Sequence, residues 1–331
     1  MTIRRRRVYD ADHEALRASV ARFLDSGAAE RQDLWAAAAE HGFVGLGAPE
    51  VDDPRFAAVV LEAAMAAGLP AFALSLAAHD GFALPLLAGR RAATRPAVVD
   101  GGDVRLAGGL LRGRAETVVN GMSADLLLVV ARTDDGDEHV VLVEAGAVHR
   151  APAEPLLGLE GLDVADCAFD LALDGNDAGN GTVEPIDADL ERARASHQLA
   201  LAVAAVAGAR TALDITVAYT RDRKAFGTPI ASFGNTRHVL GSLGARIAAV
   251  ESFVDAALES PSGLSLASAA ALRLCATEIL GTAVDTGVQL HGGYGYMWEY
   301  PIARAYAAAR FFRVHDAGEH LQEVLAGAVG L

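Results

Sequence analysis

Three cationic side chains gather where a long predicted helix ends: Arg221, Arg223 and Lys224. The segment 226–229, FGTP, ends that helix, because glycine and proline both interrupt helical structure. Cations suit the negative end of the helix dipole, so ordinary charge placement explains the cluster. Arginine also offers forked donors to phosphate, which makes the same cluster a candidate pyrophosphate clamp. Both interpretations stay open on this segment alone.

A glycine-rich loop follows in the last fifth of the chain, at 291–296, with the sequence HGGYGY. It joins two predicted helices, and the simplest interpretation is a wide interhelical turn. Glycine also removes the steric barrier to close approach, so this backbone could lie against a ligand. A lone G-G-x-G pattern is weak support for a binding site. The loop and the cationic segment, in this order within one helical region, strengthen each other.

Together these two segments resemble the acyl-CoA dehydrogenase family. The segment 221–233, RDRKAFGTPIASF, is similar to the family pattern R-x-x-F-G-x-P-I-x-x-F. The segment 289–304, QLHGGYGYMWEYPIAR, is similar to Q-x-x-G-G-x-G-Y followed by P-x-x-R. The resemblance extends upstream through 111–136 and 45–50, so it covers nearly the whole chain in the family's domain order.

The resemblance implies an α+β fold with an N-terminal helical domain, a middle small antiparallel β domain and a C-terminal four-helix bundle. It also implies FAD, bound between domains and across a subunit interface. The implied reaction is α,β-dehydrogenation of an acyl-CoA thioester, in which a carboxylate removes the α-proton and the flavin accepts the β-hydride. The family's contacts to the FAD of the neighbouring subunit fall on Arg223, Phe226, Gln289, Gly292 and Gly293.

The family's catalytic glutamate lies in a Y-E-G-T stretch, and the aligned stretch 315–318 reads HDAG. The base position therefore holds Asp316, which is one methylene shorter. A displacement of about 1 Å can cost about 100-fold in rate, although nitroalkane oxidase, a relative, uses aspartate there. Asp316 is either the base or a helix-capping residue, with Glu319 at the capping-box position. His315 is expected to be a packed histidine.

Some family members place the base on the first long helix of the C-terminal domain. That position falls near His197, where the chain has no carboxylate. The flavin pocket that a subunit builds for itself is also altered, because 87–109 contains no T-E-P…G-S-D loop. The aromatic residue and threonine of the family's W-I-T-N stretch align to Thr117 and Val119, and the Y-E-G-T threonine aligns to Gly318.

This asymmetry predicts a hetero-oligomer. The contacts lent to a neighbour are intact, whereas a homotetramer would need both halves in every chain. Some actinobacterial acyl-CoA dehydrogenases that act on bulky steroid side-chain thioesters resemble this arrangement as α2β2 heterotetramers. The implied partners are a paralogous subunit that holds the flavin and supplies the base, an acyl-CoA substrate and an electron-transfer flavoprotein as electron acceptor.

Two further hypotheses stay open from the sequence. One is a self-sufficient flavoenzyme that uses Asp316 as its base. The other is a non-catalytic acyl-CoA-binding or scaffold homologue that kept the fold and lost the chemistry. The acyl group itself is not identified by any motif.

The elements that must position these residues fall into three zones, with predicted domains at 1–95, 96–185 and 186–331. Helical spacing marks the first zone, and glycine and aspartate punctuate short apolar runs in the second. The hairpin signal Asp-Gly lies between two such runs, at 133–138. Helices are predicted at 32–41, 56–67, 71–88, 187–220, 233–258 and 264–290, with a further helix starting at Pro301. Strands are predicted at 117–120, 126–131, 139–144 and 164–171.

The composition and net charge exclude several classes of protein and site. The chain has 331 residues, 52% of them hydrophobic, and about a fifth are alanine, which favours close-packed helices. The net charge of −15 argues against a nucleic-acid binder. Two cysteines are too few for a disulfide framework or a cysteine zinc site, so we predict no metal and a cytoplasmic location. The uncharged stretch 63–78 is too short to span a bilayer, so no membrane span is predicted.

Overall fold

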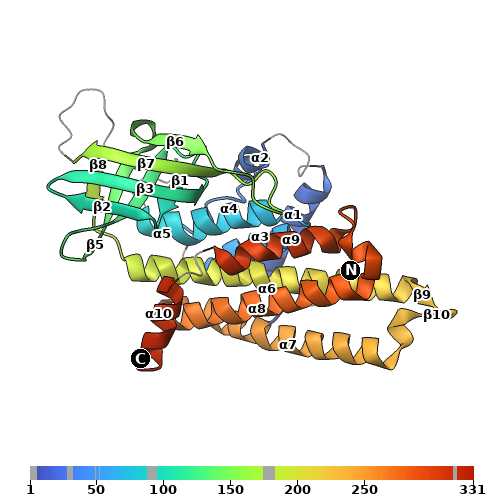
Figure 1. Cartoon of the computed structure of the whole chain (residues 1–331). Coiled ribbons are helices and arrows are strands. Elements are labelled where there is room, and N and C mark those ends of the chain that lie inside the picture. The colour runs from blue at the N-terminus through green and yellow to red at the C-terminus, as the bar shows by residue number, and fades with distance from the viewer. Residues whose placement is uncertain are drawn as a thin grey trace.

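A computed structural model describes residues 6–27, 33–48, 50–51, 53–87, 95–173, 183–315 and 319–331. Helices come first along the chain, then a sheet, then helices again, as the three sequence zones predict (Figure 1). The first helices are α1 (Ala11–Asp25), α2 (Leu34–Glu40), α3 (Pro54–Ala66), α4 (Pro70–Ala78) and α5 (Leu84–Leu87), with a π-helical turn at His79–Ala83. The predicted helix 71–88 is therefore interrupted by this turn.

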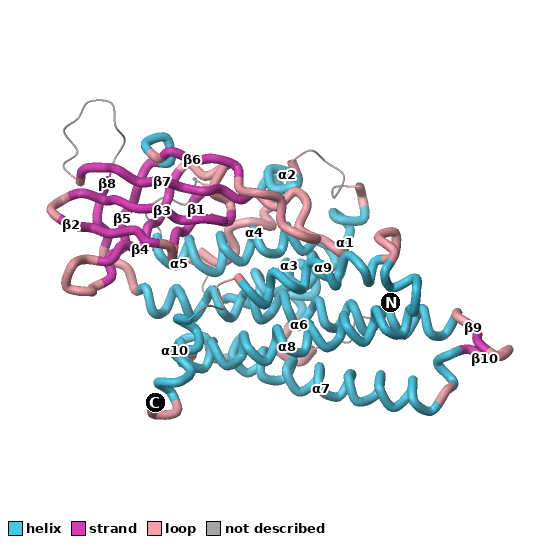
Figure 2. Tube along the Cα trace, in the orientation of Figure 1, coloured by secondary structure: helices cyan, strands magenta, loops and turns pink. Residues whose placement is uncertain are grey.

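Eight strands form one sheet at one end of the molecule (Figure 2). They are β1 (Pro96–Val99), β2 (Asp103–Ala107), β3 (Leu110–Val119), β4 (Leu126–Arg132), β5 (Glu138–Glu144), β6 (His149–Pro152), β7 (Val164–Ala172) and β8 (Val183–Ile186). The order is β6-β7-β3-β2-β4-β5-β8, with β1 also on β4. Most ladders are antiparallel, as predicted, but β4 pairs in parallel with both β1 and β2. The predicted hairpin joins β4 to β5.

The sequence patterns missed β1, β2, β6 and β8 and shortened β3. These strands are four or five residues long apart from β3, and so short a run carries little periodicity. Their pairing across the sheet, which no local pattern encodes, stabilises them instead.

The C-terminal helices are α6 (Leu190–Asp222), α7 (Gly234–Glu259), α8 (Leu266–His291), α9 (Pro301–Val314) and α10 (Glu319–Ala328). A two-stranded hairpin, β9 (Lys224–Ala225) and β10 (Thr228–Pro229), joins α6 to α7. Figure 1 shows this hairpin at the far end of the long helices from the sheet. Pro301 stands in the first turn of α9, as predicted, because proline there needs no amide hydrogen.

Alanine allows α6 to pack closely against α8 and α3. Six alanines of α6 are completely buried: Ala193, Ala202, Ala204, Ala205, Ala209 and Ala212. Small side chains bring helix axes together, and the protein core is dense as a result. A Cβ on Gly208 would lie 2.7 Å from the Met65 methyl of α3. The alanine-rich composition therefore reflects helix packing.

Three helical stretches are long and apolar enough to cross a membrane by length and composition: Pro70–Leu87, Leu190–Asp222 and Leu266–Tyr296. Their most apolar windows are 83%, 61% and 50% buried inside the protein. Packing against other helices and the sheet thus accounts for much of this apolar surface. The absence of a membrane span stays a prediction from the sequence.

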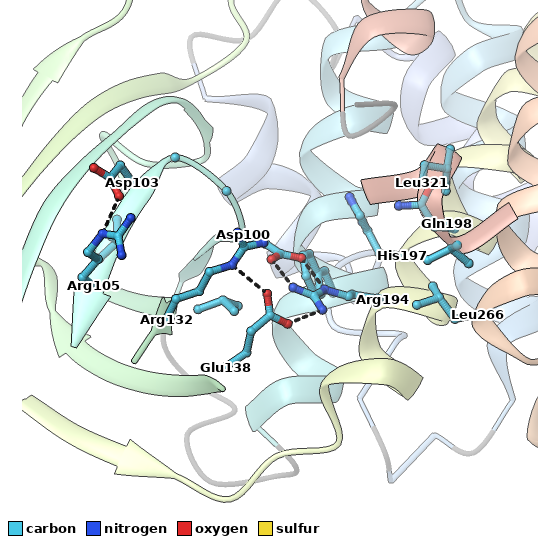
Figure 3. Close-up of a pocket in the computed structure, with 16 residues that line it drawn as sticks. Asp100, Asp103, Arg105, Arg132, Glu138, Arg194, His197, Gln198, Leu266 and Leu321 are labelled. Atoms are coloured by element: carbon cyan, nitrogen blue, oxygen red, sulfur yellow. Dashed lines mark hydrogen bonds and ion pairs between the residues drawn. The ribbon is translucent and has the colours of Figure 1, made fainter. Parts of the chain in front are cut away.

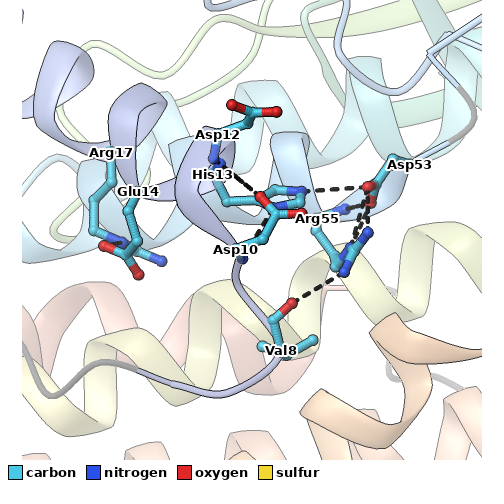
Figure 4. A network of polar contacts seen from close by, with 8 residues as sticks. All are labelled: Val8, Asp10, Asp12, His13, Glu14, Arg17, Asp53 and Arg55. Atoms are coloured by element: carbon cyan, nitrogen blue, oxygen red, sulfur yellow. Dashed lines mark hydrogen bonds and ion pairs between the residues drawn. The ribbon is translucent and has the colours of Figure 1, made fainter.

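A polar network fixes the start of α1 against α3 (Figure 4). Asp10 caps α1, and its Oδ1 lies 2.7 Å from Nδ1 of His13. The His13 ring is buried, stacks on Phe56 at 4.3 Å and places Nε2 3.3 Å from Oδ2 of Asp53. Asp53 in turn accepts hydrogen bonds from the Arg55 guanidinium. These contacts are local to the first helices and lie outside the sites described next.

Candidate functional site

The hairpin after α6 carries two of the predicted cofactor residues on a strained turn. Phe226 and Gly227 have φ angles of 52° and 80°, so both central residues of the turn have the positive φ that tight hairpin turns require. For a bulky residue this conformation costs about 1–3 kcal/mol. Phe226 is nevertheless 99% exposed. The ladder between β9 and β10 and the hydrogen bond from the Ile230 amide to the Arg223 carbonyl support the turn, and the Phe226 ring stays open to contact with another molecule.

The glycine-rich loop begins where α8 ends. Gly292 ends α8 with a φ of 61°, a conformation that favours glycine. Gly295 is also required, since a Cβ there would lie 2.4 Å from the Val288 carbonyl oxygen. A Cβ on Gly293, by contrast, would meet nothing within 4 Å. The loop therefore folds tightly on α8 and presents an open backbone surface at Gly293.

His291 and Tyr219 join the ends of α8 and α6 beneath this loop. Their rings stack with centroids 3.9 Å apart, and the Tyr219 hydroxyl donates to the His291 carbonyl at 3.2 Å. Burial lowers the pKa of His291, because the charged form loses hydration. The two predicted segments, far apart in sequence, are thereby held side by side.

Four of the five predicted cofactor residues line one groove of about 390 Å³, which we call the tip groove. Its walls come from the ends of α6 and α8 and the glycine-rich loop: Tyr219, Arg223, Ile230, Gln289, Leu290, His291, Gly292, Gly293, Tyr294 and Met297. The Arg223 guanidinium lies 5.6 Å from the Tyr294 ring centroid. Within the described chain it forms no ion pair. Phe226 lies outside the groove, on the projecting hairpin.

A second cavity, of about 350 Å³, lies between the sheet and α6 and α9, and we call it the central cavity. Its described lining includes the aligned positions Thr117 and Val119, together with His197 and His315. Thr117 has a φ of 57°, and the β3–β7 register shifts between Ala115 and Val118. Such bulges re-aim side chains beside functional sites.

The two histidines of the central cavity are packed against aromatic rings. His197 is buried, stacks on Phe82 at 4.8 Å and places Nδ1 3.2 Å from the Ala77 carbonyl oxygen. His315 stacks on Phe311 at 4.6 Å and meets the His197 ring edge-on at 6.4 Å. Both therefore have defined orientations. The predicted base Asp316, like Gly318, lies outside the described residues.

Beside the central cavity lies a charged cluster that sequence analysis missed (Figure 3). Arg194 of α6 donates to both oxygens of Asp100, at 2.8 and 2.6 Å, and to Glu138 at 2.7 Å. The hydrogen bond from Arg194 lowers the pKa of Glu138. The cluster fixes the loop after β1, whose Gly101 and Gly102 line the central cavity. Its members are far apart in sequence, so no short sequence motif contains them.

Tyr219 and Arg223 place the tip groove at the C-terminal end of α6, and His197 places the central cavity near its N-terminal end. The helix has 33 residues, which corresponds to about 50 Å. His197 and Arg223 are therefore separated by about 40 Å along its axis. The structure brings the predicted cofactor residues together, but it holds them away from the central cavity of the same chain.

The described chain offers no metal centre, since no group of three or more histidine, cysteine, aspartate or glutamate residues gathers there. Residues 190–320 match the family model for the acyl-CoA dehydrogenase C-terminal domain.

Curated relatives give partial matches. The long-chain specific acyl-CoA dehydrogenase of Rattus norvegicus mitochondria is 32% identical over 228 residues, which cover 66% of this chain and 53% of that enzyme. The chain thus spans about half the length of this relative. Acyl-CoA dehydrogenase IpdE2 of Mycobacterium tuberculosis is 36% identical over 122 residues, 37% of this chain and 36% of that protein.

Solved structures match over almost the whole chain. An acyl-CoA dehydrogenase from Geobacillus kaustophilus has a TM-score of 0.83 and 22% identity, with 98% of this chain and 100% of that chain covered. An acyl-CoA dehydrogenase complexed with FAD, from Bacillus anthracis, has a TM-score of 0.78 and 21% identity. The match covers 97% of this chain and 67% of that chain. The protein therefore has the acyl-CoA dehydrogenase fold, and its residues 190–320 are similar to the C-terminal domain of that family.

Proposed function

We propose that this chain is a subunit of an FAD-dependent acyl-CoA dehydrogenase, an oxidoreductase that introduces an α,β double bond into an acyl-CoA thioester. In this proposal the chain lends its tip groove to the FAD held by a paralogous partner subunit in a cytoplasmic α2β2 complex. Electrons leave through an acceptor such as an electron-transfer flavoprotein. The sequence resemblance extends the proposal to a bulky, steroid side-chain-type acyl group.

The separation of the two sites along α6 is the observation that carries this proposal. A cofactor that contacts Arg223 lies about 40 Å along the helix from His197. That distance exceeds what one dinucleotide spans, so a complete site needs the tip groove of one chain and the central cavity of another. An exposed, strained Phe226 beside the groove supports the same conclusion.

The residues of the tip groove fit a dinucleotide. Arg223 carries a forked donor without an ion-pair partner in the described chain, suited to a pyrophosphate. Gln289 adds an exposed amide, and the bare backbone at Gly293 leaves room for close approach. FAD, when bound, supplies the acceptor for the substrate's β-hydride. The groove's own contribution is to bind and orient the diphosphate end.

The central cavity provides little for proton removal among its described residues. Two carboxylates line it: Asp100, which is paired to Arg194, and Glu116, which is exposed on β3. Both oxygens of Asp100 already accept hydrogen bonds from Arg194, so this carboxylate is engaged within the chain. The proposal therefore assigns the base to the partner subunit, in keeping with the hetero-oligomer.

A second candidate function is a self-sufficient flavoenzyme with Asp316 as its base. One observation favours it: Asp316 follows directly after His315, which lines the central cavity. In that case a homo-oligomer would contain both halves of each site. Replacing Asp316 with Asn would then abolish turnover while FAD stays bound.

The flavin spectrum separates the two functions. The chain is purified alone and, separately, after co-expression with a paralogous subunit that has the family's glutamate. The proposal expects absorbance near 450 nm, about one FAD per two chains, only in the co-purified complex. A yellow, active homo-oligomer of this chain alone would contradict the hetero-oligomer and support the second function.

A further inference from the structure

A third cavity has no part in either site above. It measures about 690 Å³, and we call it the side cavity. It is bounded by α2, α4, α6, α8, α9 and the loop between β6 and β7. It shares no lining residue with the central cavity or the tip groove. Its volume falls in the range of small-molecule sites.

Small residues leave this space open between well-packed helices. Ala305, Ala308 and Ala309 face it from α9, and Gly208 faces it from α6. Larger apolar side chains such as the buried Phe72 form part of its walls, and charged side chains line the rest: Asp33, Arg95, Glu160, Asp163 and Arg304. The cavity thus arises from side-chain size on rigid helices, which keeps it largely pre-formed.

Aromatic and aliphatic groups give the side cavity one apolar wall. Trp35 of α2 and Phe312 of α9 contribute rings, and Ile215 and Leu280 contribute branched chains. Phe312 and Leu280 are buried from solvent. An apolar body of matching size would remove this surface from water, at about 25 cal/mol per Å². Such a site suits a hydrocarbon chain or ring system.

Two arginines line the side cavity: Arg304 donates to the carbonyl oxygens of Trp298 and Glu299, whereas Arg95 has a buried donor without a described partner. The Arg95 guanidinium lies 4.5 Å from the Trp35 ring centroid. Its Nε is buried, and no described residue accepts a hydrogen bond from it. Burial lowers the pKa of Arg95, against the opposing effect of nearby carboxylates. Leaving a buried charged donor without a partner is unfavourable.

Two carboxylates that line the cavity together with Arg95 accept hydrogen bonds from other groups. Asp163 accepts from the backbone amides of Met122 and Ser123 at 3.0 and 2.9 Å. Asp33 caps α2 by accepting from the Ala36 amide at 2.9 Å. Neither accepts from the Arg95 side chain in the described structure. An anion from outside the chain would complete its hydrogen bonding.

We propose that the side cavity binds an amphipathic organic anion, with its apolar body against Trp35 and Phe312 and its carboxylate on Arg95. This site is separate from the thioester chemistry and does not depend on flavin or on a partner subunit. It adds a second small-molecule site to the chain. A medium-chain carboxylate is the simplest ligand of this class.

Decanoate is the probe, and decan-1-ol is its neutral counterpart of equal chain length. Binding to the full chain is measured by calorimetry and by Trp35 fluorescence in a Trp298→Phe background, which leaves one tryptophan. The proposal expects saturable binding of decanoate that is at least about tenfold tighter than that of decan-1-ol, because only the anion pairs with Arg95. Equal affinity for the two probes, or no saturable binding, would overturn it.

Two variants locate the site. Arg95→Gln should weaken decanoate binding by about tenfold and leave decan-1-ol binding nearly unchanged. Ala305→Phe should weaken both, because the ring fills the cavity. Arg112→Gln is the matched control, since Arg112 is exposed on β3 and paired to Asp170. Melting temperature is recorded for each variant.

If Arg95→Gln fails to fold, Ala305→Phe still decides the location. Unchanged decanoate affinity in a folded Ala305→Phe chain would place the ligand elsewhere and overturn the proposal. Since these measurements involve neither flavin absorbance nor turnover, their result is independent of the proposed dehydrogenase function.

Discussion

At the sheet end of α6, Arg194 is largely buried and bonded to two carboxylates, whereas at the hairpin end Arg223 is exposed and lies over Tyr294. Both arginines extend from the same continuous helix or its cap. The first has its charge compensated within the chain. The second has donors to spare for another molecule.

This difference distinguishes a structural cation from a binding cation. A largely buried ion cluster such as that of Arg194 connects α6 to the end of β1 and to β5, so its loss should lower the free energy of unfolding. An exposed arginine beside an open glycine backbone contributes little to folding stability, so its loss should instead lower the affinity for FAD. The following predictions test that division, beginning with the largest effect.

Arg194→Met should give the largest change in stability. Removing the guanidinium leaves the partly buried Asp100 without its partner and leaves Glu138 only its longer contact with Arg132, at a cost of about 3 kcal/mol. Chemical denaturation followed by circular dichroism measures the free energy of unfolding. Arg105→Met is the control, because its pair with Asp103 is exposed and should contribute below about 1 kcal/mol. Equal losses of unfolding free energy in the two variants would contradict the structural role of Arg194.

Arg223→Gln should reverse this pattern. The free energy of unfolding should stay within about 0.5 kcal/mol of the parent, since the side chain is exposed. FAD affinity of the assembled complex should fall by about tenfold to a hundredfold, because a charged hydrogen bond is lost. Flavin titration of the complex measures this. Arg221→Gln, on the same helix end but outside the tip groove, should retain FAD.

Phe226→Gly should move stability and binding in opposite directions. Glycine relieves the positive φ, which should stabilise the folded chain by about 1 kcal/mol, and no burial is lost because the ring is 99% exposed. Loss of the ring should weaken FAD binding in the complex. Thermal melts of the chain and flavin titration of the complex report the two effects. A destabilised variant would mean that the ring packs within its own chain.

The smallest effects concern pH. Burial lowers the pKa of His291 below 6.5, so folding stability should fall as the pH drops below 6.5, where the unfolded chain takes up a proton first. The Arg194 hydrogen bond lowers the pKa of Glu138 below 4.5, so its contribution is present above pH 4.5 and lost in more acidic solution. His291→Gln and Glu138→Gln should each flatten one part of the stability profile. If the dependence of folding stability on pH stays the same in both variants, the assignment of these two pH ranges to His291 and Glu138 is wrong.

Long elements with strong periodicity could be predicted from the sequence. The predicted helices 187–220, 233–258 and 264–290 correspond to α6, α7 and α8 within a few residues. Their caps and breakers are local, so the sequence encodes them directly. The short strands and the π-helical turn within 71–88 depend on contacts with distant segments, and local patterns missed them.

The candidate site divides in the same way. Arg223, Gln289, Gly292 and Gly293 were predicted as a group from two motifs, and the structure places them in one groove. Phe226 was predicted with them but lies on the hairpin outside the groove. The role of Asp316 stays a prediction, since that residue lies outside the described chain.

By itself, the sequence determined the helix–sheet–helix order and the residue types of the tip groove, because both reside in local periodicity and short motifs. Only the tertiary structure decided where these residues lie relative to the central cavity, since the length of α6 sets the two ends about 50 Å apart. It also decided the pairing of Arg194 and the isolation of Arg95. Those depend on which distant segments meet, and burial then determines whether a charge is compensated or left for a ligand.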